Sequence, residues 1–161
     1  MTIQVGDKMP EGGFMQMTDD GPAPITSSDL FDGKKVVLFA VPGAFTPTCS
    51  AKHVPGFVSR ADELKAKGVD TIACLSVNDV FVMNAWGKDQ SVGSKVMMLA
   101  DGSGDYVSRL GLELDLTPRG MGKRATRFAM IVNDGKVEHL GVESNPGELT
   151  VSGADAILEK L

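Results

Sequence analysis

Short apolar segments alternate with stretches of helical periodicity along this chain. Residues 36–41 and 71–77 are rich in β-branched side chains and almost continuously apolar, which is typical of strands buried on both faces. Between them, apolar residues recur at helical spacing and predict a helix lying on the sheet: Val54, Phe57, Val58, Ala61 and Leu64. This alternation predicts an α/β protein.

The second half of the chain continues the pattern. A helix is expected after Asp79, with Val82, Ala85 and Trp86 on one face and an end near Gly87, and a shorter helix after the loop 102–105. Residues 97–100 should form another strand. Two further apolar segments, 127–132 and 136–142, flank Asn133-Asp134-Gly135 and predict an antiparallel hairpin. The sheet is therefore expected to be mixed, with helices on both faces.

The last helix is expected to open at Ser152, with Asp155 completing a capping box. Its apolar residues lie at i, i+3, i+4 and i+7: Ala154, Ile157, Leu158 and Leu161.

Composition places the chain among globular proteins. Its 161 residues, 42% hydrophobic and 23% charged, predict one domain spanning residues 1–161. The net charge of -5 is scattered, which argues against nucleic acid or a membrane surface as partner and favours a small or neutral substrate. No export signal or membrane segment is visible, so a cytoplasmic location is expected, and Cys49 and Cys74 are first treated as thiols.

The loop 42–50 carries the most informative chemistry. It leaves an expected central strand and delivers Cys49 at a helix start, and sites of α/β proteins lie at the carboxyl ends of strands. Unpaired N–H groups at a helix start stabilise a thiolate, so Cys49 is a candidate nucleophile, although an arbitrary cysteine is more often a small buried residue. Thr46, three residues earlier, can place a hydroxyl on that sulfur or can simply cap the helix.

The motif Pro42-x-x-x-Thr46-x-x-Cys49 resembles the peroxidatic signature of the peroxiredoxins. Four surrounding segments are similar to the type II, or peroxiredoxin-five-like, subfamily: 41–50 (VPGAFTPTCS), 53–57 (HVPGF), 74–79 (CLSVND) and 85–87 (AWG). The resemblance runs from about Gly6 to Leu161. It implies a thioredoxin-like fold, reduction of hydrogen peroxide and organic hydroperoxides, and no metal or organic cofactor.

The resemblance also implies the site residues. Cys49, Thr46 and Arg127 would be catalytic, and Pro42 would join them in binding the substrate. Arg127 stands where a loop enters a strand, and a guanidinium there would hold a thiolate and bind peroxide oxygens. Without the resemblance, nothing would distinguish Arg127 from Arg124.

Competing interpretations concern the remaining thiol and imidazole groups. His53 and Cys49 at i, i+4 could begin a cysteine hydrolase, but no orienting group is apparent, so His53 is expected to be structural or at the pocket rim. A zinc site would need pairs of ligands at close spacing along the chain, which the cysteines and histidines do not provide.

Cys74 lies inside an apolar strand and is expected to be inert. Valine stands at position 151, where other subfamily members carry a resolving cysteine, which favours recycling by glutathione and glutaredoxin or by thioredoxin.

The alternative function is a peroxide sensor that passes oxidation from Cys49 to a partner protein. Both functions need the same reactive thiol, so only repeated turnover separates them. The resemblance further implies a homodimer with its contact near the active-site loops, for which Phe45 and Pro47 supply apolar surface.

Overall fold

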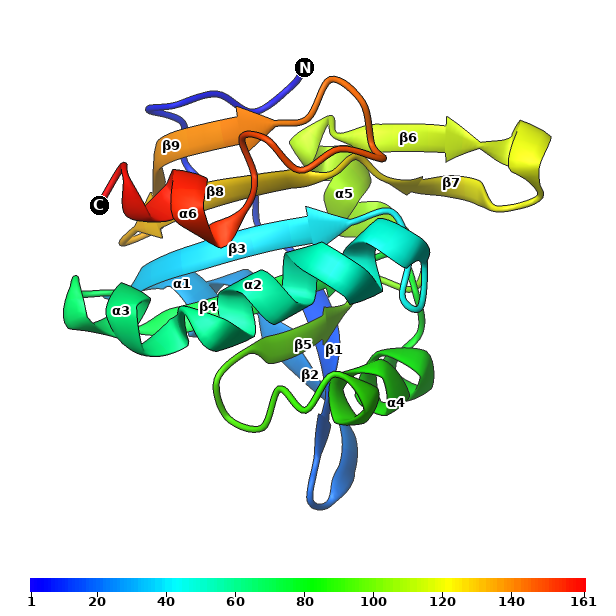
Figure 1. The fold of residues 1–161 in the computed structure, drawn as a ribbon, viewed down its shortest axis with the longest axis horizontal. Coiled ribbons are helices and arrows are strands. Elements are labelled where there is room, and N and C mark those ends of the chain that lie inside the picture. The colour runs from blue at the N-terminus through cyan, green and yellow to red at the C-terminus, as the bar shows by residue number, and fades with distance from the viewer.

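The computed structural model describes residues 1–161 and is built on a seven-stranded sheet with the order β2-β1-β5-β4-β3-β8-β9 (Figure 1). These strands are β1 Gly13–Thr18, β2 Gly21–Thr26, β3 Lys35–Val41, β4 Thr71–Ser76, β5 Met97–Ala100, β8 Phe128–Asn133 and β9 Lys136–Val142. The central strands β3, β4 and β5 are parallel, and the outer pairs are antiparallel. The prediction of a mixed sheet is confirmed. Strands β6 Glu113–Leu116 and β7 Gly122–Ala125 form a separate antiparallel pair.

Six α-helices cover the two faces of the sheet: α1 Ser27–Phe31, α2 Val54–Ser59, α3 Ala61–Ala66, α4 Val80–Asp89, α5 Asp105–Leu110 and α6 Ala154–Leu158. Side chains of β3 alternate between two cores, as the two-residue period of a strand requires. Val37 and Phe39 join α2, α3, α4 and α6, while Val36 and Leu38 join α1 and α5. None of these helices combines the length and the apolarity that a membrane crossing needs.

The predicted hairpin forms as expected. Strands β8 and β9 pair on either side of Asp134 and Gly135, which both take positive φ, at 49° and 79°. A two-residue hairpin turn of this hand requires such angles, and glycine adopts them without strain.

Three helix predictions need correction. The helix expected over residues 54–64 is broken at Arg60, which leaves helical geometry. Helix α4 buries Val80, Met83, Trp86 and Gly87 rather than Val82 and Ala85, because packing on the sheet selects the face that carries Met83.

The capping box predicted at the last helix is absent. Gly153 is the N-cap of α6, because the Ser152 hydroxyl donates to Glu143 and Asp155 pairs with Arg60. The apolar face of α6 is nevertheless buried as predicted through Ala154, Ile157 and Leu158, with Leu161 partly buried against the same core.

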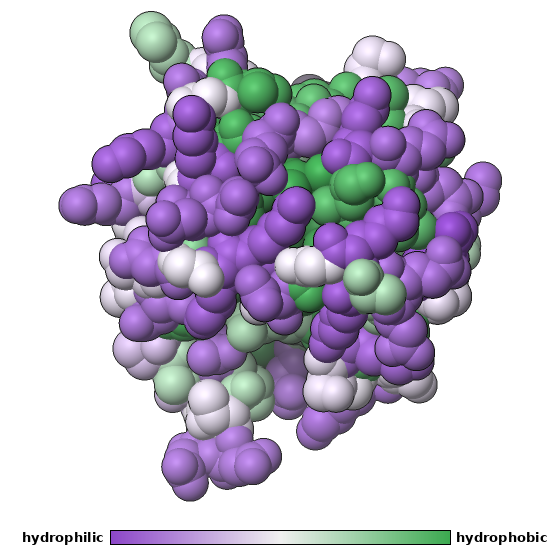
Figure 2. Space-filling model, turned by 90° about the vertical axis from the view of Figure 1, so that its left-hand side faces the viewer, coloured by the Kyte–Doolittle hydropathy of each residue, from purple (hydrophilic) through white to green (hydrophobic).

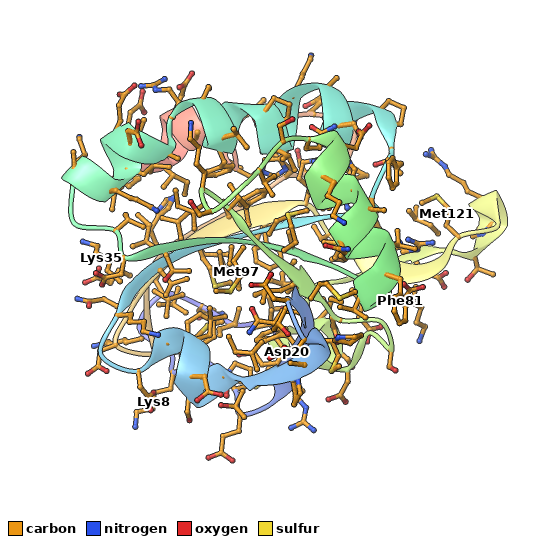
Figure 3. All side chains as sticks on the ribbon, turned by 90° about the horizontal axis from the view of Figure 1, so that it is seen from below. Lys8, Asp20, Lys35, Phe81, Met97 and Met121 are labelled. Carbon is orange, nitrogen blue, oxygen red and sulfur yellow. The ribbon has the colours of Figure 1, made fainter.

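The two ends of the sheet differ in character. Strands β3 and β4 point toward one end of the molecule. The loop before α2, helix α4 and the β6–β7 pair lie together at that end (Figure 1). The opposite end, which faces the viewer in Figure 2, is covered largely by hydrophilic residues around smaller apolar areas. Lys35, which opens β3, lies at that end, away from Phe81 and Met121 (Figure 3).

Candidate active site

The loop after β3 is held closely against its neighbours. The Ala44 N–H donates to the Asn78 side-chain oxygen at 3.0 Å, and the Ser76 hydroxyl donates to the same oxygen at 2.6 Å. Gly43 is tightly packed, since a Cβ there would lie 3.2 Å from both Thr46 Cγ2 and Arg124 Nη1 and would push these side chains aside. The loop is therefore fixed by the end of β4 and by its own packing.

Cys49 lies in the first turns after this loop and is fully buried. The Thr46 hydroxyl oxygen lies 2.8 Å from Cys49 Sγ and 2.7 Å from the Gly43 carbonyl oxygen. A hydroxyl carries one hydrogen, and the carbonyl can only accept. Thr46 can therefore donate to the Gly43 carbonyl or to an ionised sulfur, but not to both at full strength.

Arg127 uses all three guanidinium nitrogens within the protein. Its Nη2 donates to Cys49 Sγ at 2.9 Å, its Nη1 lies 2.8 Å from His53 Nδ1, and its Nε donates to the Pro146 carbonyl at 2.9 Å. The residue is only 2% exposed and forms no carboxylate ion pair. The Cys49 sulfur therefore lies directly against a buried guanidinium that has no carboxylate partner of its own.

His53 is neutral, and its partners fix which nitrogen carries the proton. Nε2 lies 2.8 Å from the Ser152 carbonyl, which can only accept, and Nδ1 faces Arg127, which can only donate. The proton therefore lies on Nε2. Burial, followed by the charge of Arg127, lowers the pKa of His53 to about 3. This histidine is fully buried and bonded to Arg127, so of the two places expected for it the structural one is confirmed and the pocket rim is not.

A wider helical turn carries Cys49. Residues Cys49–His53 form a π-helical turn in which the Val54 N–H bonds the Cys49 carbonyl. Pro55, at the start of α2, has no N–H to continue the regular series of helical hydrogen bonds, and a π turn is one way to accommodate that loss.

Helix α4 also contacts this turn. The Trp86 indole, fully buried on α4, donates to the Ser50 hydroxyl at 3.0 Å.

The structure brings together the three residues predicted to be catalytic. Pro42 is buried at the base of the same loop. Arg124 instead donates to the carbonyls of Met121 and Val77 and forms no bond to Cys49. The Pro146 and Ser152 carbonyls were not anticipated from the sequence, since backbone acceptors carry no side-chain signal.

Cys74 has a different environment. It is fully buried within β4, where it pairs in register with Phe39, and it forms no disulfide. Burial, and then the nearby charge of Cys49, raises the pKa of the Cys74 thiol. Its sulfur therefore remains protonated.

The redoxin family model matches residues 4–158. Peroxiredoxin-2B from Arabidopsis thaliana is 55% identical over 161 residues, covering 99% of this chain and 98% of the relative. The chain is a type II peroxiredoxin of the redoxin family. The solved structure of reduced Prx3 from Vibrio vulnificus in complex with hydrogen peroxide superposes with a TM-score of 0.94 at 49% identity, covering 99% of each chain. Peroxiredoxin 5 from Alvinella pompejana gives a TM-score of 0.84 at 37% identity, covering 98% of this chain and 96% of that one.

As a peroxiredoxin, the protein is a thiol-dependent peroxidase with a thioredoxin-like fold. Peroxidase chemistry at a thiol needs a sulfur held as its anion and hydrogen-bond donors beside it. Of the two cysteines in this peroxiredoxin, Cys49 has both donors and Cys74 has neither.

Proposed function

We propose that Cys49 is the peroxidatic thiolate, that Arg127 and Thr46 are catalytic partners, and that Pro42 helps to shape the peroxide site. The observation that carries this proposal is the pair of donors on one sulfur, Thr46 Oγ1 at 2.8 Å and Arg127 Nη2 at 2.9 Å. Cys49 attacks one oxygen of the hydroperoxide, a sulfur–oxygen bond forms, and the oxygen–oxygen bond breaks. The leaving oxygen takes a proton and departs as water or alcohol, and Cys49 becomes a sulfenic acid.

The two donors act where charge moves during this step. Negative charge passes from sulfur to the leaving oxygen, so donors that span both atoms bind the transition state more tightly than they bind the substrate. Arg127 is already held by His53 and Pro146, which leaves Nη2 directed at the reacting sulfur. Thr46 can transfer its single hydrogen bond between the Gly43 carbonyl and the sulfur without moving its oxygen.

No metal or organic cofactor is part of the proposal. The peroxide accepts two electrons, and the sulfur of Cys49 supplies them, so the step balances with the protein and substrate alone.

The proposed reductant is glutathione with glutaredoxin, and thioredoxin is the alternative. A thiolate displaces water from the sulfenic acid to give a mixed disulfide on Cys49, and a second thiol releases the reduced enzyme. The π-helical turn and Pro55 make the segment around Cys49 a weak point of the helix. Loss of the thiolate contacts upon oxidation should let this turn open toward a small thiol. The protonated state of Cys74 argues against it as the internal resolving thiol.

Mass spectrometry tests this route. Peroxide-treated wild type, given glutathione, should carry a mixed disulfide on Cys49, and Cys74→Ser should keep most of its glutathione- and glutaredoxin-supported turnover. A Cys49–Cys74 disulfide as the main product, with Cys74→Ser inactive, would make Cys74 the resolving residue.

A homodimer is proposed at the active-site end of the molecule. Phe45 is 53% exposed and holds a strained backbone with φ of 64°, and Phe81 is 64% exposed on α4. Exposed aromatic side chains at one end are typical of an interface. Sedimentation of the reduced protein should show a disulfide-free dimer, and a pure monomer at micromolar concentration would contradict it.

A cytoplasmic location is proposed on the strength of two free cysteines, which suit a reducing compartment. One relative, peroxiredoxin-2E of Arabidopsis thaliana, is chloroplastic and 50% identical over 164 residues, covering 99% of this chain and 70% of the relative. Fluorescence microscopy of the tagged protein in its own cells tests the location. Exclusive labelling of an organelle would contradict it.

A further inference from the structure

A buried carboxylate lies behind the active site. Glu143 follows β9 directly and is 4% exposed, yet it forms no ion pair. Its oxygens accept bonds from the backbone N–H groups of Thr150, Val151 and Ser152 at 2.8–3.1 Å, and from the hydroxyls of Thr150 and Ser152 at 2.7 and 2.6 Å. This one side chain organises the far end of the loop 144–152.

The carboxylate stays ionised in this position. Burial by itself raises the pKa of Glu143, but the hydrogen bonds from Ser152, Thr150 and Val151 outweigh that effect and lower the pKa to about 2. Donors that converge on a carboxylate stabilise its anionic form. At neutral pH the Glu143 carboxylate therefore stays ionised and keeps its hydrogen bonds to the loop 144–152.

The anchored loop supplies the two backbone acceptors that hold Arg127 and His53. The Pro146 carbonyl accepts from Arg127 Nε at 2.9 Å, and the Ser152 carbonyl accepts from His53 Nε2 at 2.8 Å. His53 in turn accepts from Arg127 Nη1. Glu143 also donates its own backbone N–H to the Arg127 carbonyl at 2.9 Å. Two side-chain contacts and one backbone contact of Arg127 thus depend on Glu143 and its loop.

We propose that Glu143 is a positioning residue for Arg127 and that its carboxylate directs Nη2 onto Cys49 by holding the Pro146 and Ser152 carbonyls in place. The proposal rests on the proposed role of Arg127 in catalysis. Glu143 touches neither Cys49 nor the peroxide site, so its effect must pass through the guanidinium. A small displacement of a donor lowers the rate strongly, because the bond must be aligned in the transition state.

The variant Glu143→Gln keeps the shape of the side chain but replaces one acceptor oxygen by an amide NH2 group. This donor would face the N–H and hydroxyl donors of residues 150–152. We expect the rate constant for oxidation of Cys49 by hydrogen peroxide to fall about tenfold or more. Stopped-flow fluorescence of Trp86 measures this rate constant. The ultraviolet absorbance of the Cys49 thiolate at neutral pH should fall with it. A loss of stability alone would move neither signal.

Asp101→Asn is the matched control. Asp101 is buried to a similar degree, at 5% exposed, and likewise accepts backbone N–H groups, those of Tyr106 and Val107 at 3.2 and 2.9 Å. Its side chain forms no hydrogen bond with the loop 144–152. This variant should lower the free energy of unfolding while leaving the rate of peroxide reduction within about twofold.

A double-mutant cycle with Arg127→Ala decides the proposal. If Glu143 acts through Arg127, Glu143→Gln should slow an Arg127→Ala enzyme no further. Independent, multiplying losses would overturn the proposal, as would an unchanged rate for folded Glu143→Gln. Should Glu143→Gln fail to fold, Ser152→Ala removes one hydroxyl bond and should give a smaller loss that also vanishes in Arg127→Ala. An Arg127→Ala enzyme with normal rate would instead contradict the proposed function itself.

Discussion

Cys49 and Cys74 are both fully inaccessible and belong to the same apolar cluster, yet their surroundings have opposite chemical consequences. Around Cys49, Thr46 of the preceding loop and Arg127 directly before β8 bring a hydroxyl and a guanidinium within 3 Å of the sulfur. Around Cys74, strand pairing with Phe39 fills the space with apolar groups, and burial raises the thiol pKa. Burial therefore does not decide whether a thiol is inert; the donors beside it do.

The largest predicted difference is between serine substitutions at these two positions. Cys49→Ser should abolish peroxide turnover, because a serine hydroxyl does not ionise near neutral pH and cannot accept the oxygen. Cys74→Ser should keep most of the turnover. Consumption of hydrogen peroxide with a glutathione and glutaredoxin supply measures both, and circular dichroism checks that each variant is folded. Equal losses in both variants would remove the distinction between the two thiols.

The next comparison separates two arginines. Arg127→Ala should slow oxidation of Cys49 by about 10²-fold or more, which is the effect of removing one well-placed donor from a transition state. Arg124→Ala should change the rate by less than about threefold, since Arg124 bonds only backbone carbonyls at the loop edge. Rapid-mixing kinetics with hydrogen peroxide gives both constants. Similar losses would show that the guanidinium on Cys49 has no special role.

A smaller effect distinguishes the two histidines by pH. His53 stays neutral in the folded protein down to a pKa of about 3, whereas in the unfolded chain it gains a proton below about pH 6.5. The unfolded state therefore binds more protons in this range, and stability should fall as pH falls, by up to ~1.4 kcal/mol per unit. This contribution is complete above about pH 6.5.

Urea unfolding of His53→Gln and His139→Gln between about pH 6.5 and 5 tests this assignment. Glutamine at 53 keeps one donor and one acceptor, so the slope of stability with pH should flatten in that variant. His139 is only half-buried, and burial lowers its pKa without excluding it from solvent. The variant His139→Gln should therefore keep most of the dependence of stability on pH. A steep slope that survives His53→Gln would mean that His53 is protonated in the folded state.

The sequence predicted the elements that depend on local rules. The strands at β3, β4 and β5 and the hairpin at Asp134 and Gly135 follow from apolar runs and turn residues. Strands β1 and β2 were missed, because Pro22 and Pro24 give β2 the composition of a loop. The face of α4 was misassigned because Val82 and Met83 are both apolar, and only packing on the sheet selects between them.

The site was predictable only in part, for a related reason. Cys49 and Thr46 lie close in sequence, so their meeting follows from one turn. Arg127 lies 78 residues from Cys49, and only the family resemblance selected it over Arg124. Residues that act through backbone carbonyls or through a loop, such as Pro146 and Glu143, leave no pattern that a single sequence reveals.

The central claim is that peroxide reacts at Cys49 and not at Cys74. Reduced wild type should be given one equivalent of hydrogen peroxide together with a reagent that traps sulfenic acids, and both cysteine peptides should then be quantified by mass spectrometry. The account predicts the trapped adduct on the peptide of Cys49 alone, with Cys74 recovered as a free thiol. An adduct mainly on Cys74, or loss of peroxide with both thiols intact, would contradict it.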